Sequence, residues 1–133
     1  MDTSSYFAYP GEPAEAAAGV LAEASQEDWE LVLAHTETRR FRPGEWLVRE
    51  GEQDRALYLL SDGRLETHDA PAVVGELSFL DGLPQPAGLR AVTHGEAQRL
   101  SFDAFEALSA RAPRLARDLL LDVARIVAAR VRA

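Results

Sequence analysis

The sequence predicts a single α+β domain that is mostly β, with helices at both ends. Apolar residues follow a helical spacing before residue 35 and again after residue 101. Between these points, short runs of β-type residues alternate with turn signals such as Pro43-Gly44 and Asp62-Gly63. Many short strands flanked by helices are typical of a β-sandwich or barrel to which helices have been added.

The helical start of the chain has two parts. Residues 1–11 are predicted to form an irregular arm, and one folded domain is predicted over 12–133, with its helical part over 12–34. Ser25 and Asp28 have the spacing of a capping box, which predicts a helix over residues 26–34; the alanine-rich stretch at 13–24 predicts another before it. The arm contains three aromatic residues that either dock on the domain or contact a partner: Tyr6, Phe7 and Tyr9.

The β part is predicted over residues 36–101. Its strand candidates are residues 46–49, 56–60, 64–68, 72–74, 87–93 and 96–101. The apolar run at 56–60 predicts a buried strand. Trp46 and Val48 alternate with their neighbours, which predicts that they share one face of a strand. The third and fourth candidates are predicted to form a hairpin.

Two helices are predicted over residues 102–133. Ser101 has the character of an N-cap, and Pro113 suits the first turn of the longer helix. That helix carries two apolar stripes, namely Leu119, Val123 and Ile126, and Leu120, Ala124, Val127 and Val131. A helix resting on one globular surface needs a single stripe. We therefore expect one stripe to face the domain and the other a second copy of the chain; one broad buried face is the alternative. The candidate dimer interface draws on both stripes: Leu119, Leu120, Val123, Ala124, Val127 and Val131.

Composition and charge exclude several kinds of function. The 133 residues include no cysteine, which excludes disulfides and thiolate chemistry. No apolar run approaches the roughly 20 residues that span a bilayer, and no signal-peptide pattern opens the chain. The net charge of −8 argues against general nucleic-acid binding, although residues 111–133 carry six arginines and two aspartates, a local +4. We expect a cytoplasmic protein without a DNA or membrane partner.

Four short motifs in order resemble the cyclic nucleotide-binding domain, the sensor domain of catabolite-activator (Crp/Fnr) regulators and of cyclic-nucleotide-dependent kinases. They are Phe41-Arg42-Pro43-Gly44-Glu45, Arg49-Glu50-Gly51, Ala56–Leu60 with Gly63, and Gly75-Glu76-Leu77-Ser78-Phe79-Leu80. The resemblance runs from about residue 20 to the end. It implies a β-roll of the jelly-roll or double-stranded β-helix type, with N-terminal helices and two C-terminal helices, and a dimer seam along the last helix.

The fourth motif resembles the family's phosphate-binding cassette, but it is degenerate here. The resemblance implies that a short helix begins at Gly75-Glu76 and that the glutamate accepts a hydrogen bond from the ribose. The position of the phosphate-binding arginine falls on Gln85, and the next residue is Pro86, which has no N–H to donate. The vestigial site would comprise Gly75, Glu76, Leu77, Ser78, Gln85 and Pro86. We therefore expect no cofactor; a cyclic nucleotide is possible but disfavoured.

Two further observations bear on this loss. Arg90 could replace the missing arginine, but its apolar neighbours predict that it points outward. Only a short segment separates Gly63 from Gly75. The resemblance implies a longer strand pair there, so we expect a clipped hairpin and a shallower pocket. Glu76 also has a simple structural explanation, because an acid in the first turn stabilises a helix through its dipole.

No catalytic motif is present. The histidines, His35, His68 and His94, are scattered, and Ser78 lies in no nucleophile elbow. Three functions remain: a degenerate, dimeric interaction or scaffold module with an unidentified protein partner; a true cyclic-nucleotide sensor with an altered pocket; and a DNA-binding regulator. The first is favoured, and no enzyme and no metal site is expected.

Overall fold

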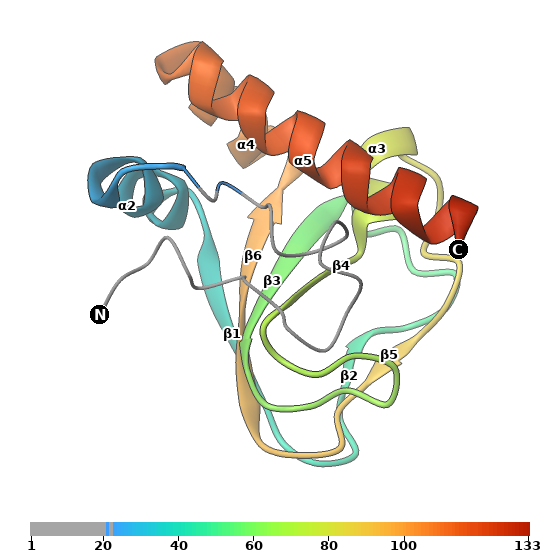
Figure 1. Ribbon diagram of the computed structural model, residues 1–133. Helices are drawn as coiled ribbons and strands as arrows, with labels where there is room; N and C mark the ends of the chain where they lie inside the picture. Colours follow the sequence, from blue (N-terminus) through green and yellow to red (C-terminus); the bar gives the residue numbers. More distant parts are fainter. Residues whose placement is uncertain (1–20, 22) are drawn as a thin grey trace.

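The computed structural model describes Leu21 and residues 23–133 (Figure 1). The predicted arm and nearly all of the alanine-rich helix lie outside these residues. In chain order the elements are α2 (Gln26–Ala34), β1 (Glu37–Phe41), β2 (Trp46–Val48), β3 (Ala56–Asp62), β4 (Ala72–Val74), α3 (Glu76–Asp81), β5 (Leu89–Arg90), β6 (Gly95–Ser101), α4 (Phe102–Arg111) and α5 (Pro113–Arg132). The predicted α+β class, a β-roll with helices at its ends, is confirmed.

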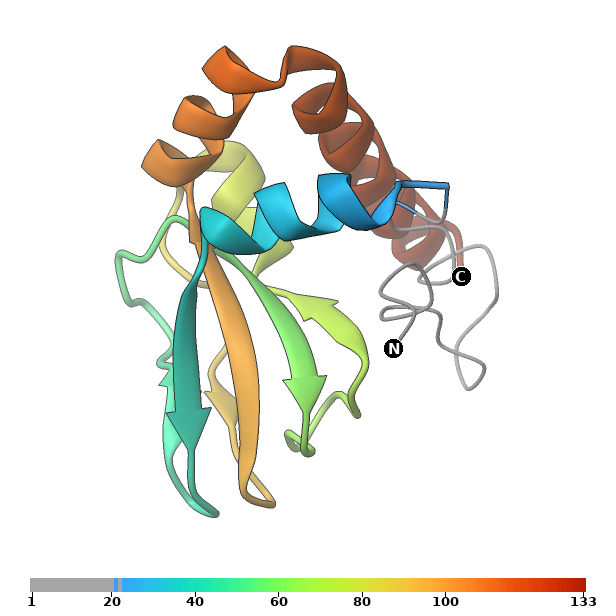
Figure 2. The same cartoon turned by 90° about the vertical axis from the view of Figure 1, so that its left-hand side faces the viewer.

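The strands form two antiparallel sheets, which together make a roll. One sheet has the strand order β1-β6-β3-β4, and the other pairs β2 with β5. Helices α2, α4 and α5 lie across one end of the roll, and α3 lies beside α5 (Figures 1 and 2). Strands far apart in sequence are therefore brought together beneath a helical cap.

Strand β3 separates two hydrophobic cores. Leu57 and Leu59 point toward the helices, where they pack with Trp29 and Phe79. The alternate residues, including Tyr58, face the inside of the roll. Because successive side chains point to opposite faces of a strand, β3 needs apolar residues throughout. The predicted buried strand is confirmed.

The helix boundaries follow the capping signals of the sequence. Ser25 and Asp28 form the predicted capping box at the start of α2. The Ser101 hydroxyl accepts a hydrogen bond from the Ala104 backbone N–H at 3.1 Å, which caps α4. Pro113 is the first residue of α5. These three predictions are confirmed, because each depends only on contacts between near neighbours in the chain.

The predicted hairpin between residues 64–68 and 72–74 is wrong. Strand β4 pairs instead with β3, with Val73 opposite Leu59, while Leu65 forms a bridge to Ala91. Pairing along β3 buries all three side chains of β4, which a small isolated hairpin could not do. The predicted strand at 87–93 is also shorter, because only Leu89–Arg90 pair with β2.

Trp46 and Val48 do not share a face, contrary to the alternation in the sequence. The register of β2 against β5 shifts between them, and such an irregularity changes the direction of the side chains. Val48 is buried in the roll, whereas Trp46 is 41% exposed. The Trp46 ring lies directly over Gly88: a Cβ added at Gly88 would lie 2.4 Å from its Cζ3 atom.

Replacing Gly88 by alanine is expected to destabilise the domain by about 1–3 kcal/mol, because the new methyl group overlaps the Trp46 ring. Urea unfolding of Gly88→Ala would measure this cost. In a Trp46→Ala background the overlap is absent, so the same substitution should cost much less. An equal cost in both backgrounds would show that the ring is not the cause.

Candidate functional site

The loop that resembles a phosphate-binding cassette begins with a tight turn at Gly75. Gly75 has φ +78°, and a Cβ at this position would lie 2.9 Å from the backbone oxygen of Ala56. Glycine is therefore required both by the left-handed backbone and by the close approach of β3. The turn directs the chain from β4 into α3, which ends at Gly82 in a second left-handed residue.

Glu76, the first residue of α3, is already engaged by the last helix. Its carboxylate accepts a hydrogen bond from Arg130 Nη1 at 2.6 Å, and only 13% of its side chain is exposed. Arg130 also donates from Nη2 to the backbone oxygen of Val73 at 3.3 Å. One guanidinium of α5 thus joins α3 to β4. The carboxylate that the resemblance assigns to ribose recognition has an internal partner.

Gln85 occupies the predicted position of the phosphate-binding arginine and is held on three sides. Its side-chain Nε2 donates to the backbone oxygen of Asp54 at 2.8 Å. Its backbone N–H donates to Glu52 at 2.9 Å, and its backbone oxygen accepts from Gly51 at 2.8 Å. The side chain is only 3% exposed. Gln85 therefore fastens the cassette to the segment before β3.

The remaining residues of the predicted site do not converge. Leu77 is exposed to solvent, and Pro86 is exposed as well. Ser78 is buried, and its hydroxyl has no hydrogen-bond partner among the described residues. Of the predicted site residues, the structure does bring Gly75 close to Gln85. A Cβ added at Gly75 would lie 3.8 Å from Gln85 Nε2.

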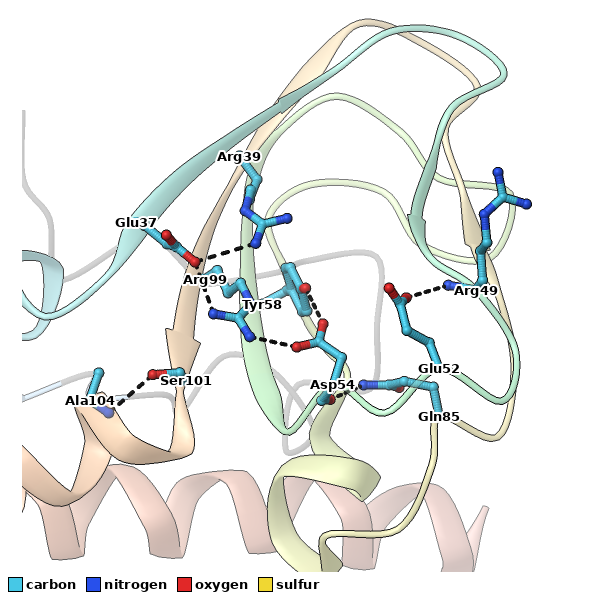
Figure 3. A network of polar contacts seen from close by, with 10 residues as sticks. All are labelled: Glu37, Arg39, Arg49, Glu52, Asp54, Tyr58, Gln85, Arg99, Ser101 and Ala104. Carbon is cyan, nitrogen blue, oxygen red and sulfur yellow. Dashed lines mark hydrogen bonds and ion pairs between the residues drawn. The ribbon is translucent and has the colours of Figure 1, made fainter.

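A polar network connects the cassette to the roll (Figure 3). The Asp54 carboxylate accepts from Arg99 Nη2 at 2.6 Å through Oδ1 and from the Tyr58 hydroxyl through Oδ2. Arg99 reaches Glu37 on β1 as well, at 2.9 Å. Tyr58 and Arg99 are direct neighbours across β3 and β6. The sheet register therefore assembles the network around Asp54.

Burial and charge change the acidity of two groups in this network. Burial raises the pKa of the Tyr58 hydroxyl, and the neighbouring Asp54 carboxylate raises it further. Tyr58 therefore remains a hydrogen-bond donor well into alkaline solution. The hydrogen bonds from Arg99 and then Arg39 lower the pKa of Glu37. Glu37 is exposed to solvent, so the lowered pKa of its carboxyl contributes little to stability.

Arg55 holds the other end of α3. Its Nε donates to the backbone oxygen of Phe79 at 3.0 Å, and its Nη2 donates to that of Leu80 at 3.2 Å. The guanidinium also lies 3.5 Å from the centre of the Phe102 ring at the start of α4. A cation at a helix C-terminus satisfies free carbonyls and complements the dipole. Arg55 and Arg130 together hold α3 against the C-terminal helices.

The two stripes of α5 have different surroundings. Leu119, Val123 and Ile126 are buried in the helical core, so Leu119 and Val123 are removed from the candidate dimer interface. On the other stripe Leu120 is 38% and Val131 is 79% exposed, Ala124 is exposed and Val127 is half-buried. Arg130 turns toward α3, where it pairs with Glu76. Arg125 pairs within α5, with Asp122 at 2.9 Å.

Arg90 points outward, as the sequence predicts. Its Nε donates to the backbone oxygen of Gly44 at 3.3 Å, and its guanidinium lies 5.7 Å from the centre of the Trp46 ring. These contacts keep Arg90 on the outer surface of the β2–β5 sheet. It therefore supplies no charge to the cassette.

Other chemical features are few in the part of the chain that the structure describes. No group of three or more histidines and acids there is placed to hold a metal ion. Across the same residues, no helix combines the length and the apolar character needed to cross a membrane. A cleft of about 880 Å³ lies between the segment before α2 and the first half of α5. None of the described residues that line this cleft belongs to the cassette.

The sequence analysis missed the residues from other parts of the chain that contact the cassette or form the polar network beside it. The sequence motifs do not point to Arg130, Asp54, Arg55, Tyr58 or Arg99 as residues of the site. The only available signal was the position of Asp54 and Arg55 next to a buried strand. Strand register and the path of α5 bring these residues together, and neither can be read from local spacing.

The comparisons with known proteins agree with this geometry. The family profile described as "Cyclic nucleotide-binding domain" matches residues 38–112. The chain is 31% identical over 83 residues to the "cAMP-dependent protein kinase regulatory subunit" of Emericella nidulans, covering 54% of this chain and 20% of that protein. It is 25% identical over 118 residues to an uncharacterized NTE family protein of Mycobacterium tuberculosis, covering 81% and 20%. The chain thus spans about a fifth of these relatives.

Solved structures show the same fold. A cyclic nucleotide-binding domain from Methylobacillus flagellatus superposes with a TM-score of 0.75 at 24% identity, covering 81% of this chain and 68% of that one. The catabolite activator protein of Thermus thermophilus gives a TM-score of 0.72 at 26% identity, covering 86% and 58%. The resemblance inferred from four short motifs is confirmed. Because the profile match covers more than half of the sequence, the chain belongs to the cyclic nucleotide-binding domain family.

Proposed function

We propose that this domain has lost cyclic-nucleotide binding and acts as a dimeric regulatory or protein-interaction module. The observation that carries the proposal is the state of Gln85. Where the resemblance places a phosphate-binding arginine, a neutral amide is buried and donates to the Asp54 backbone. Losing a charge-assisted hydrogen bond costs on the order of 1.5–3 kcal/mol. At about 1.4 kcal/mol per tenfold change in affinity, micromolar binding is hard to retain.

The contacts of Glu76 support the proposal from the other end of the cassette. A ribose hydroxyl would have to share its carboxylate with Arg130, which already lies 2.6 Å away. Pro86 removes one further backbone donor, because proline has no N–H. Cassette groups suited to a nucleotide are thus missing or engaged within the protein.

The interior of the roll also supports the loss of binding. Four side chains that face inward from three separate segments are almost completely buried: Tyr58, Leu65, Ala72 and Val74. Side chains packed to this extent leave little room for a base and a ribose. A nucleotide would have to displace this packing as well as compete with the internal hydrogen bonds.

A non-catalytic role fits both the family and the site. The cyclic nucleotide-binding family is regulatory and generally non-enzymatic. A nucleophile or general base needs a hydrogen-bonded partner that activates it. Ser78 has no such partner among the described residues. Regulation through contacts with other proteins is the simplest remaining use of the domain.

We place the dimer contact on the open stripe of α5. Leu120, Val127 and Val131 present apolar surface there, and a two-fold contact between identical helices is the commonest closed symmetry. An unidentified protein partner would then recognise the dimer. We further propose that the module and this partner are cytoplasmic.

A true sensor with an altered pocket is the second candidate. Two retained features favour it: Gly75 still opens the turn, and Glu76 still begins α3 with its free backbone N–H groups. The fungal kinase regulatory subunit and the Methylobacillus flagellatus domain are also named for cyclic nucleotides. This candidate requires Arg130 to release Glu76 when the nucleotide enters.

Isothermal titration calorimetry with cyclic AMP and cyclic GMP tests the proposal. The wild type is expected to give no binding tighter than about 10 μM, a level near −7 kcal/mol. The double change Gln85→Arg with Pro86→Ser restores a charge and a donor, and is expected to raise affinity at least about tenfold, since one charge-assisted hydrogen bond is sufficient for that gain.

The matched control is Gln85→Glu with Pro86→Ser, which restores the donor but adds a repelling charge and should bind no nucleotide. Wild-type binding below 10 μM would favour the sensor and contradict the proposal. A silent Gln85→Arg, Pro86→Ser variant with the wild-type fold would mean that the packed roll also prevents binding.

A further inference from the structure

We propose that Arg99 and Tyr58 form an anion site which the protein occupies with its own Asp54 carboxylate. The site is latent: it would accept a small oxyanion, such as formate or phosphate, once that carboxylate is removed. This inference rests on the proposed loss of nucleotide binding. In a domain without a bound nucleotide, the Asp54 carboxylate provides the acceptor for the Arg99 and Tyr58 donors beside the cassette.

Both oxygens of the Asp54 carboxylate receive strong donors. Arg99 Nη2 lies 2.6 Å from Oδ1, and the Tyr58 hydroxyl donates to Oδ2. Only 12% of the Asp54 side chain and 20% of the Arg99 side chain are exposed. Charge-assisted hydrogen bonds with this degree of burial resemble those that hold bound carboxylates and phosphates. Asp54 is therefore bound in the manner of a ligand.

The network lies against the cassette. Gln85 Nε2 donates to the backbone oxygen of Asp54 (Figure 3). The Tyr58 ring lies close to the turn at Gly75, where an added Cβ would lie 3.2 Å from its Cδ2 atom. Tyr58 thus touches both the Asp54 carboxylate and the start of α3. An external anion at this place would meet the same hydroxyl and the same guanidinium.

One donor of the site is unused. The Nε–H of Arg99 is buried and has no hydrogen-bond partner within the described residues. Arginine presents its donors as a planar fork that suits oxyanions with several oxygens. A buried donor without an acceptor costs free energy. The guanidinium therefore has capacity for an acceptor beyond the single Asp54 oxygen and Glu37.

Glu37 provides a matched control within the same network. It also pairs with Arg99, at 2.9 Å, but its side chain is 58% exposed. Removing Glu37 leaves Asp54 in place, so the site stays occupied. Removing Asp54 leaves Arg99 with the exposed Glu37 carboxylate and the Tyr58 hydroxyl, and it leaves the Tyr58 hydroxyl without the carboxylate that accepts its proton. Only the second change should create a vacancy for an anion.

The test is thermal unfolding of the full chain in formate, in phosphate and in chloride at equal ionic strength. Asp54→Ala is expected to gain about 3–6 °C more in Tm from formate or phosphate than the wild type gains, as occupied sites stabilise a domain of this size. The wild-type gain gives the general salt effect, since phosphate stabilises proteins without binding a site. Glu37→Gln should behave as the wild type does.

Two results would overturn the inference. One is an anion gain in Asp54→Ala no larger than in the wild type. The other is an equal gain in the Arg99→Gln, Asp54→Ala double variant, which lacks the guanidinium. If Asp54→Ala does not fold in chloride, formate should restore folding. Asp54→Ser, whose shorter side chain also vacates the site, should then gain more than Glu37→Gln, and no gain from either Asp54 variant refutes the site.

The experiment contains no nucleotide, so its outcome is separate from that of the proposed function. Nucleotide binding by the wild type would contradict the proposed function and leave these comparisons unchanged. Conversely, an absent anion response would refute the latent site while the calorimetric result for the wild type still holds.

Discussion

Val127→Glu is expected to give a folded monomer, whereas the wild type is expected to be a dimer at tens of micromolar. Val127 lies on the open stripe of α5 with Leu120 and Val131, which are 38% and 79% exposed. Burying an apolar side chain of this size contributes about 1.5–3 kcal/mol. A glutamate on each side of a two-fold seam should weaken association at least about 100-fold, or roughly 2.7 kcal/mol. Multi-angle light scattering measures the oligomeric state, and circular dichroism measures whether the variant is folded.

Val123→Glu is the control for this experiment. Val123 is completely buried on the inner face of α5, so a glutamate there should unfold the domain and not merely dissociate the dimer. Leu120→Glu, on the open stripe, should reproduce the folded monomer. A wild type that remains monomeric at tens of micromolar would contradict the seam. Unfolding of both Val127→Glu and Leu120→Glu would show that the open stripe belongs to the core.

Arg130→Ala is expected to destabilise the domain by about 2–3 kcal/mol. Glu76 is 13% exposed and would lose its counter-charge, and the backbone oxygen of Val73 would lose a donor. Removing one partner of a mostly buried pair costs more than the pair itself contributes, because the remaining charge stays buried. Urea unfolding with an unchanged m-value measures the loss.

Arg125→Ala is the control, on the same helix. The Arg125 side chain is 70% exposed, and its partner Asp122, although only 12% exposed, also accepts a hydrogen bond from the Leu21 backbone N–H at 2.9 Å. Asp122 therefore keeps a donor when Arg125 is removed, and the loss should be about 0–1 kcal/mol. A double-mutant cycle with Glu76→Gln then separates the pair from other effects of Arg130. Equal losses for Arg130→Ala and Arg125→Ala would mean that Arg130 does not hold α5 to the cassette.

Local signals predicted much of this fold because their physics is local. The capping residues Ser25 and Ser101 satisfy backbone groups two or three residues away, so their position in the chain predicts a helix start. The apolar run at Ala56–Leu60 needs two buried faces, which already indicates a central strand. The two stripes of α5 follow from helical spacing, and the structure separates them into a buried and an open face.

Non-local pairing produced the errors. Strand β4 could have paired with the preceding residues 64–68, and nothing in its three apolar residues excludes that register. Pairing with β3 buries more surface and therefore prevails. The irregularity between Trp46 and Val48 depends in the same way on a distant partner, because β5 follows β2 by about forty residues in the sequence. Sequence spacing contains no information about either partner.

The sequence by itself determined that Gln85 and Pro86 stand where the resemblance places a cation and a donor. It also determined the helical ends and the central strand, which depend on neighbours within a few positions. Only the tertiary structure decided what replaces the missing groups. Arg130 reaches Glu76 across 54 positions, and Arg99 reaches Asp54 across 45. Such pairs form because folding removes water from these charged side chains, and a charge that is removed from water needs a partner of opposite charge within the protein.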